Sequence, residues 1–318
     1  MLRDISSLFW SEEVFNGAKI RDCSKGEGVN PKDFEKQIWE YDTLNILKEF
    51  SDLDLFFKGG TCVQSLLPFD YQRFSIDLDF NIEIKDRTKE FILSKFRELN
   101  ERLEKEDLST PASVTKYKKK SSDDLVYGNF YPRDYDEISG TLTFIRIFMT
   151  KIGSRIMKFV YMDDLRQKKY LSGVFNHILV QVNIKHQPPA LKWELKDITL
   201  KIQKYPEYKK GLQFKCLSVG DLFADKLMAF KNRKAFKDLY DLGMMVKIIK
   251  DLDIETSKQK INQIFGDTAM IQDVVKAIEF SLKNKEYSKH IHSLPKEVAP
   301  SIMDRMFYTK LIDVIEGI

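Results

Sequence analysis

The sequence contains little cysteine or histidine and no long apolar run. Its 318 residues include three Cys, widely spaced, and four His, which excludes a disulfide framework and a zinc-finger spacing. No segment approaches the roughly 18 apolar residues of a membrane helix, and the N-terminus lacks the basic start and apolar core of a signal peptide. We therefore expect a cytoplasmic protein without a membrane partner.

The sequence also lacks a strong excess of charge. Lys plus Arg number 52 and Asp plus Glu 48, a formal net charge of +4, so the composition permits a nucleic-acid partner without requiring one. Basic clusters at 116–120, 192–196 and 231–237 could contact phosphates. Each cluster taken alone is more simply explained as a solvated face.

The N-terminal third alternates helix and strand signals. Asn30 and Pro31 supply the cap and first residue of a helix. A short strand then runs into Gly59-Gly60, and a two-turn helix follows as far as Pro68. Residues 75–84 alternate between apolar and polar side chains, which predicts a strand, and 86–107 have the pattern of an amphipathic helix.

The rest of the chain changes from strands to helices. Residues from about 112 to 203 form β-rich runs separated by polar turns, and the chain after about 218 is helical in pattern. We therefore predict an α+β (mixed α/β) fold in two domains. Residues 1–205 would hold an N-terminal helical segment and a mixed sheet flanked by helices, and 206–318 a helical domain that contributes to the active-site cleft.

Two carboxylates occupy polar positions of the strand at 75–84. Asp77 and Asp79 are residues i and i+2, so they share a face, opposite Leu78 and Phe80. Two such charges repel unless a cation lies between them, and Mg²⁺ prefers oxygen ligands of this kind. An i, i+2 Asp pair on a strand is nevertheless more often a solvated outer face.

A glycine pair lies upstream of these carboxylates. Gly59 and Gly60 fall between a strand and a helix, where backbone N–H groups can approach phosphate oxygens, and Thr61 can donate a hydroxyl. A glycine pair after a strand is usually only a turn. The order strand, turn, helix and acidic strand within 23 residues is much less frequent by chance, and it indicates a phosphate cradle beside a metal pair.

The sequence at this point resembles a known family. Gly59-Gly60-Thr61 followed by Arg73-x-Ser75-x-Asp77-x-Asp79 is similar to the AbiEii-like toxin nucleotidyltransferases, including the MenT toxins, of the DNA polymerase β-like superfamily. Residues 222–242, LFADKLMAFKNRKAFKDLYDL, resemble the family's second block, A-[ED]-K-h-x-A…R…[KR]-D-h-[YF]-D-h, in which h is apolar. The resemblance covers roughly residues 55 to 250.

The second block can also be interpreted from its residues. Ser218 with Asp221 resembles a capping box, and Asp238 and Asp241 are i and i+3, so both can face one neighbour. Without the resemblance, an exposed helix pair with ordinary ion pairs would be the better interpretation. The resemblance implies that Lys226 and Asp241 are catalytic, with Asp238 as their companion.

The resemblance also implies the other site residues. Asp77 and Asp79 would hold Mg²⁺, or Mn²⁺ in its place. Many nucleotidyltransferases add a third carboxylate from a later strand, where this chain offers Asn183. Asn183 could be a metal ligand through its carbonyl oxygen, or the site could bind one metal tightly and another only with nucleotide. The triphosphate would lie along the following residues: Lys58, Gly59, Gly60, Thr61, Arg73, Ser75 and Lys226.

The implied function is that of a toxin in a bacterial toxin–antitoxin or abortive-infection system that defends against phage. It would move a nucleotidyl group from a nucleoside triphosphate such as GTP to an acceptor such as the 3′ end of tRNA. The implied partner is a winged-helix antitoxin encoded nearby, which need not contact the toxin. Two alternatives stay open: transfer to a small molecule or protein, and a module that binds the triphosphate without transfer.

Overall fold

A computed structural model provides the structure of the chain. It describes residues 15–50, 53–82, 88–105, 129–149, 151–152, 157–163, 167–173, 175–184, 192–250, 252–265, 269–283 and 305–318. The chain divides into two compact units, each built from separate segments. Unit 1 comprises Met1–Leu55, Ile76–Lys185 and Tyr205–Lys210, and unit 2 comprises Phe56–Ser75, His186–Lys204 and Gly211–Ile318.

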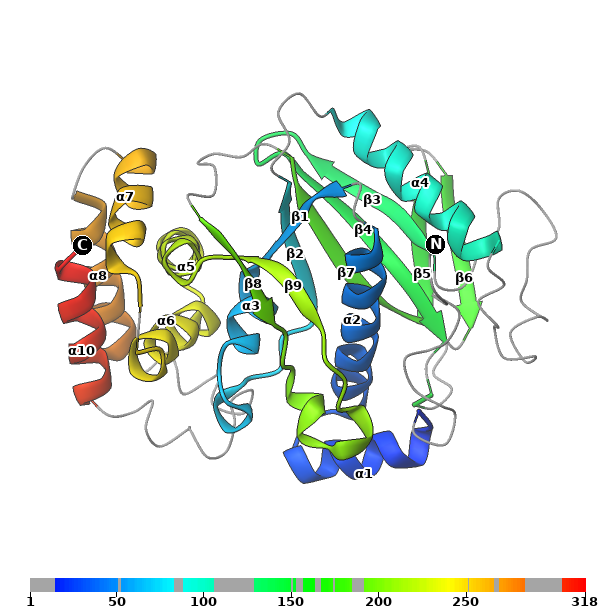
Figure 1. Cartoon of the computed structure of the whole chain (residues 1–318), viewed down its shortest axis with the longest axis horizontal. Helices are drawn as coiled ribbons and strands as arrows, with labels where there is room; N and C mark the ends of the chain where they lie inside the picture. Colours follow the sequence, from blue (N-terminus) through cyan, green and yellow to red (C-terminus); the bar gives the residue numbers. More distant parts are fainter. Residues whose placement is uncertain are drawn as a thin grey trace. The chain divides into compact units, whose positions relative to one another are not determined.

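Four strands of unit 1 form a mixed sheet in the order β3-β4-β7-β2 (Figure 1). They are β2 (Asp77–Ile82), β3 (Phe130–Asp136), β4 (Thr141–Met149) and β7 (Phe175–Asn183). The pair β2–β7 is parallel, whereas β7–β4 and β4–β3 are antiparallel. Strands β5 (Met157–Asp163) and β6 (Gln167–Gly173) form a separate antiparallel hairpin.

Helices cover the apolar face of this sheet. Helices α1 (Gly17–Glu27) and α2 (Pro31–Glu49) begin at the caps Asn16 and Asn30, and α4 (Lys89–Lys105) follows β2. Helix α2 packs on β7 and α4 on β3 (Figure 1). Their aromatic rings stack on β4, with Trp39 against Phe148 and Phe96 against Phe144. Aromatic packing of this kind is a large part of the core energy.

Unit 2 contains three strands in the order β1-β9-β8. Strand β1 (Leu55–Lys58) is parallel to β9 (Gln213–Leu217), which is antiparallel to β8 (Trp193–Asp197). Helix α3 (Gly59–Ser65) follows β1 directly, and two short 3₁₀ helices, η2 (Phe69–Tyr71) and η4 (Lys201–Lys204), pack together. The chain from β1 to Ser75 therefore belongs to the same unit as the C-terminal helices.

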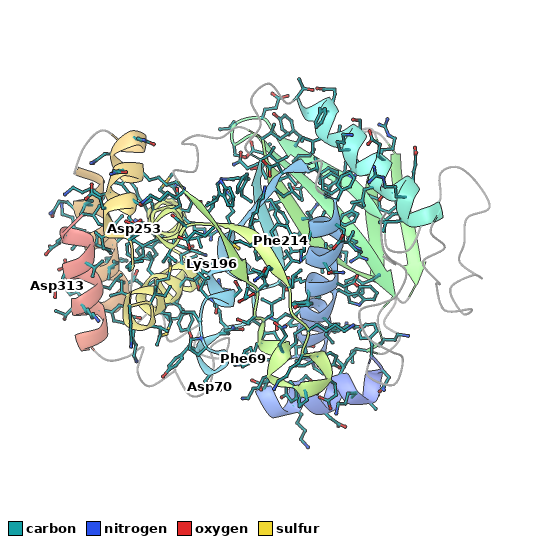
Figure 2. The ribbon with its side chains drawn as sticks, viewed as in Figure 1. Phe69, Asp70, Lys196, Phe214, Asp253 and Asp313 are labelled. Carbon is teal, nitrogen blue, oxygen red and sulfur yellow. The ribbon has the colours of Figure 1, made fainter. Side chains whose placement is uncertain are left out.

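Those helices are α5 (Val219–Arg233), α6 (Phe236–Ile248), α7 (Ile254–Phe265), α8 (Ala269–Lys283) and α10 (Arg305–Glu316). Helix α5 packs on α6, α7 and α8, and it also contacts α3 (Figure 1). Ser218 caps α5 by accepting from the Asp221 backbone N–H at 3.2 Å. Asp253, labelled in Figure 2, caps α7 by accepting from the backbone N–H and the hydroxyl of Thr256, and these hydrogen bonds lower the pKa of Asp253 to about 2.

The fold class predicted from the sequence is confirmed, since the structure is a mixed α/β arrangement of mixed sheets and helices. The Asn30-Pro31 helix start, the two-turn helix after β1 and the Ser218 cap are also confirmed. A domain boundary at about residue 205 stays a prediction. In the part of the chain that the structure describes, no helix has the length and apolarity to cross a membrane.

Candidate functional site

Strand β2 carries the two carboxylates on one face. Asp77 and Asp79 are half-buried, and they alternate with Leu78 and Phe80, which are completely buried. The alternation follows from the pleat, which directs successive side chains to opposite faces. The predicted placement of the Asp pair on one face of a strand is therefore what the structure shows.

The parallel neighbour β7 continues this polar face with amides. Asp79 lies in register with Gln181, and Asn81 with Asn183. The side-chain carbonyl oxygens of Asn81 and Asn183 are buried and accept no hydrogen bond from any residue that the structure describes. A buried carbonyl oxygen without a donor is costly, so both oxygens are suited to a ligand or a cation.

These donors fit a hard divalent cation. Mg²⁺ binds carboxylate and amide oxygens and retains several waters. Within the described ranges, no three side chains among His, Cys, Asp and Glu are grouped to hold a metal by themselves. A cation here would therefore depend on Asp77 and Asp79 together with amide oxygens, water and substrate.

A buried acid on α2 lies within electrostatic reach of the pair. Glu40 is completely buried, and its two carboxyl oxygens make no hydrogen bond to a described residue. Burial, followed by the charge of Asp77, raises the pKa of Glu40 well above its usual value. Glu40 was not singled out from the sequence, because it lies on a helix outside both motifs.

The second group of predicted residues surrounds Gly60 in unit 2. An atom at the Cβ position of Gly60 would lie 2.8 Å from Arg73 Nη2, 2.9 Å from Ser75 Oγ and 3.7 Å from Lys226 Nζ. Two cationic nitrogens and a hydroxyl thus crowd one glycine, so a side chain there would require Arg73 and Ser75 to move. We call Gly60, Arg73, Ser75 and Lys226 the Gly60 cluster.

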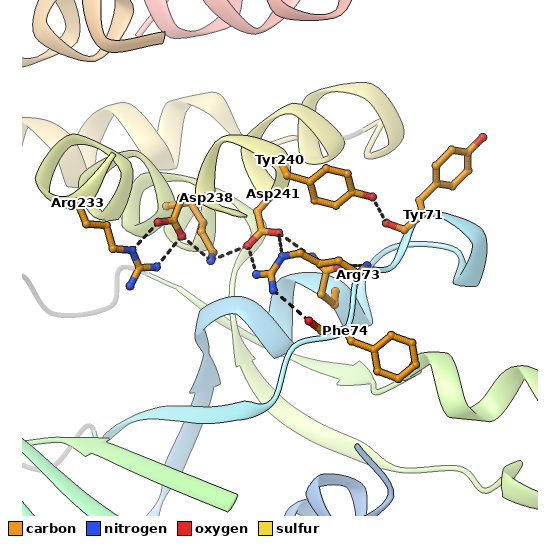
Figure 3. Close-up of polar contacts among 9 residues, drawn as sticks. Tyr71, Arg73, Phe74, Arg233, Asp238, Tyr240 and Asp241 are labelled. Carbon is orange, nitrogen blue, oxygen red and sulfur yellow. Dashed lines mark hydrogen bonds and ion pairs between the residues drawn. The ribbon is translucent and has the colours of Figure 1, made fainter. Parts of the chain in front are cut away.

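Asp241 on α6 anchors the two cations of this cluster (Figure 3). Its Oδ1 accepts from Arg73 Nε at 2.8 Å, and its Oδ2 accepts from Arg73 Nη2 at 2.7 Å. Lys226 Nζ also lies 2.7 Å from Oδ2. Burial alone would lower the pKa of Arg73, but the charge of Asp241 and its hydrogen bonds outweigh burial and raise that pKa.

Asp238, one turn earlier on α6, extends the network. It accepts from Lys226 Nζ at 3.2 Å and from Arg233 through two nitrogens at 2.5 and 2.6 Å (Figure 3). Burial would raise the pKa of Asp238, but Arg233 and Lys226 outweigh burial and lower it. The expectation that Asp238 and Asp241 face one neighbour is confirmed, and that neighbour is Lys226.

A separate buried ion cluster joins α5 to α7. Lys260 Nζ lies 2.9 Å from Asp221 and 2.8 Å from Asp225, and Lys260 is almost completely buried. Asp225 also reaches Lys58, at 4.0 Å, directly before the glycine pair. Burial would lower the pKa of Lys260, but the two carboxylates outweigh burial and raise it.

The predicted site residues fall into two groups, one in each unit. Gly60, the cations and Asp241 belong to unit 2, whereas the Asp pair and Asn183 belong to unit 1. Thr61 is completely buried inside α3. Of the basic clusters, 192–196 is mostly exposed on β8, and 116–120 lies outside the described residues.

Two members of the unit 2 network were not singled out from the sequence. Gln64 on α3 bonds both Arg73 and Asp241, and Arg233 bonds Asp238. Gln64 is four residues after Gly60, so it lies on the same face of the helix one turn later. The i, i+4 spacing from Gly60 is the sequence signal from which Gln64 could have been predicted as a neighbour of the site.

Comparison with known proteins gives a family. Residues 44–308 match the model of the family described as nucleotidyl transferase AbiEii toxin, type IV toxin–antitoxin system. No curated protein matches the chain.

The solved structures that resemble the chain include the following two. JHP933 from Helicobacter pylori is 15% identical, with 97% of this chain and 92% of that chain covered, at a TM-score of 0.42. The nucleotidyltransferase toxin MenT4 from Mycobacterium tuberculosis is 16% identical, with coverage of 85% and 73% and a TM-score of 0.43.

Proposed function

Because the chain belongs to the AbiEii family of nucleotidyl transferase toxins of type IV toxin–antitoxin systems, we propose that it transfers a nucleotidyl group from a nucleoside triphosphate to RNA. The acceptor we propose is the 3′ end of tRNA. One observation carries the proposal: two cations and a hydroxyl converge on Gly60, where an added side chain would displace Arg73 and Ser75. Such a set of donors suits phosphate oxygens.

In the proposed reaction, an acceptor hydroxyl attacks the α-phosphorus of the triphosphate. The new oxygen–phosphorus bond forms as the α–β anhydride bond breaks, pyrophosphate leaves, and the hydroxyl proton passes to solvent. The protein contributes mainly by positioning and by charge neutralisation. Lys226 and Arg73 would offset the negative phosphate charge, and Ser75 would donate a hydrogen bond.

The carboxylate pair would hold the divalent cation. Asp77 and Asp79 provide two anionic oxygens on one face of β2, and Asn183 an amide oxygen on β7. When bound, Mg²⁺ or Mn²⁺ would neutralise charge that develops on the phosphate oxygens. The protein's own part is to keep the two carboxylates fixed on a strand.

Three further residues support the triphosphate in this proposal. Lys58 is held weakly by Asp225, at 4.0 Å, so it can exchange that partner for a phosphate. Gly59 has a positive φ of 76°, which a residue with a side chain adopts at a cost. Thr61 is buried in α3 and would act by fixing that helix.

The proposed setting is a cytoplasmic toxin that arrests growth, including in defence against phage. The proposed nucleotide is GTP. The proposed partner is a winged-helix antitoxin from a neighbouring gene, which need not bind the toxin. This setting is tested by measuring the growth of bacteria after the gene for this chain is induced, with and without the neighbouring antitoxin gene.

The decisive test combines wild type with Asp77→Asn and Asp79→Asn. Each radiolabelled triphosphate is incubated with protein, Mg²⁺ and total tRNA. We expect label on RNA from wild type, with a loss of about a hundredfold or more in either variant. Asp134→Asn changes an exposed acid on β3 and serves as the matched control, with unchanged transfer.

A second candidate function is a sensor that binds the triphosphate without transfer. It is favoured by the absence of an acid at the β7 positions in register with Asp77, Asp79 and Asn81. Those positions carry Leu179, Gln181 and Asn183. In the same assay, triphosphate binding by calorimetry without pyrophosphate release would support the sensor. Equal labelling by wild type and Asp77→Asn would contradict the metal site.

A further inference from the structure

Gln64 occupies the centre of the unit 2 network. It is completely buried on α3. Its side-chain Nε2 donates to Asp241 Oδ1 at 2.8 Å, and its Oε1 accepts from the Arg73 backbone N–H at 2.7 Å. Because one contact is to a carboxylate and the other to an N–H, only one orientation of the amide satisfies both.

Asp241 has no acceptor capacity to spare. A carboxylate offers about four lone-pair sites. Oδ1 receives Gln64 Nε2 and Arg73 Nε, and Oδ2 receives Arg73 Nη2 and Lys226 Nζ. A base must accept a proton from the nucleophile at a free lone pair, so a completely buried Asp241 with these four donors is suited to orient side chains instead.

Gln64 fixes the main chain of Arg73, whereas Asp241 fixes its guanidinium. Together they leave the side chain with one orientation, in which Nη2 lies beside Gly60. Without Gln64, Arg73 would keep its ion pair but lose the anchor of its backbone. Preorganised charges of this kind bind phosphates without a cost of reorganisation.

We propose that Gln64 is a positioning residue, which together with Asp241 holds Arg73 and Lys226 ready for the triphosphate, and that Asp241 takes no proton in the reaction. This inference rests on the proposed function. Neither side chain would touch the substrate. Gln64 therefore acts on nucleotide binding through Arg73.

Gln64→Met tests the proposal, since Met has a similar volume and neither hydrogen-bonding group. We expect KM for the triphosphate to rise about tenfold, with a smaller fall in kcat and an unchanged pH profile. Gln203→Met is the matched control. Gln203 is also buried in unit 2, accepts from the Leu200 backbone N–H, and should leave KM unchanged.

A charge substitution provides a second variant. Gln64→Glu places a second carboxylate against Asp241 Oδ1, so we expect a larger rise in KM than in Gln64→Met. An equal or smaller rise in Gln64→Glu would contradict direct contact between the two side chains.

An observation without nucleotide separates the two proposals. Nitrogen NMR follows the exchange of the Arg73 Nε–H with water, and the signal is assigned by its loss in Arg73→Lys. This exchange should be slow in wild type and faster in Gln64→Met. Unchanged exchange, or unchanged KM in Gln64→Met while wild type binds the triphosphate, would overturn this inference alone. Failure of wild type to bind any triphosphate would overturn the proposed function as well.

Discussion

Gly60 shows how a missing side chain determines a site. The space next to its Cα is occupied by Arg73 Nη2, Ser75 Oγ and Lys226 Nζ. A methyl group there must displace both Arg73 and Ser75, because 2.8 and 2.9 Å are closer than a Cβ tolerates. The glycine thus preserves the approach of the three polar groups.

We predict that Gly60→Ala weakens triphosphate binding by about tenfold or more, since about 1–3 kcal/mol is a typical cost of overpacking. Isothermal calorimetry measures the effect. Gly211→Ala is the control, because nothing lies within 4 Å of the position of its added methyl group. Equal affinity in Gly60→Ala and Gly211→Ala would show that the Gly60 cluster does not bind phosphate.

Glu40 is a buried acid whose raised pKa makes stability depend on pH. Below the usual carboxyl pKa, both the folded and unfolded states are protonated. As pH rises from there toward the raised folded value, the unfolded state loses its proton first, so Glu40 progressively destabilises the folded state.

We therefore predict that Glu40→Gln stabilises the protein by about 1–3 kcal/mol at neutral pH, with a smaller gain near pH 4. Denaturant melts at several pH values measure this difference. Glu35→Gln is the control, because Glu35 is also buried on α2 but accepts from the Lys151 backbone N–H. A gain that is independent of pH would contradict our account.

At the residue scale, the sequence motifs singled out Asp77, Asp79, Gly60, Lys226 and Asp241 as candidate site residues. They could not single out Glu40, because the burial of its carboxyl group without a hydrogen bond depends on how α2 packs against the sheet. Nor did they show how many donors each acid accepts. Both facts come from tertiary packing.

At the scale of elements, Lys260 joins α7 to α5. It lies between Asp221 and Asp225, which are one turn apart on α5. Loss of its charge would leave a completely buried Asp221 without that cation. A folded protein in which a buried acid has lost its cationic partner is much less stable than one with the intact ion pair or with apolar residues in its place.

We predict that Lys260→Met destabilises the protein by about 3–5 kcal/mol, and lowers the melting temperature accordingly. Calorimetry provides the measurement. Lys258→Met, at a half-buried position of the same helix, should change stability by less than about 0.5 kcal/mol. A similar effect of both substitutions would show that the ion cluster is not what holds α7.

The elements themselves were largely predictable. The alternation at 75–84 predicted β2, and the Asn30-Pro31 and Ser218 caps predicted the starts of α2 and α5, because these signals are local. The order of strands was not predictable in this way. Strand β1 pairs with β9, more than 150 residues later, through a register that local sequence does not encode.

At the scale of the whole molecule, the two units interleave along the chain. Unit 2 includes residues 56–75, which supply β1, α3, Gln64 and Arg73. A fragment of residues 206–318 would lack both strands that pair with β9, and it would lack Gln64 and Arg73, two of the partners of Asp241. The predicted boundary at about 205 can therefore be tested directly.

We predict that residues 206–318 alone do not fold cooperatively. The reason is that Asp241 would be left without Gln64 and Arg73, and β9 without β1. Nitrogen–proton NMR and a thermal melt of the fragment provide the measurement. A dispersed spectrum with a sharp transition would contradict this prediction and support an independent C-terminal domain.

The three cysteines offer a native set of probes. Cys23 lies in unit 1, and Cys62 and Cys216 in unit 2, all of them buried as free thiols. Burial raises the pKa of Cys23 and Cys62, which further suppresses the reactive thiolate. Alkylation therefore requires local opening, and mass spectrometry can time it separately for each unit. Because Cys62 follows Gly60 by two residues, the alkylation rate of Cys62 also reports whether bound nucleotide suppresses local opening of the chain at Gly60.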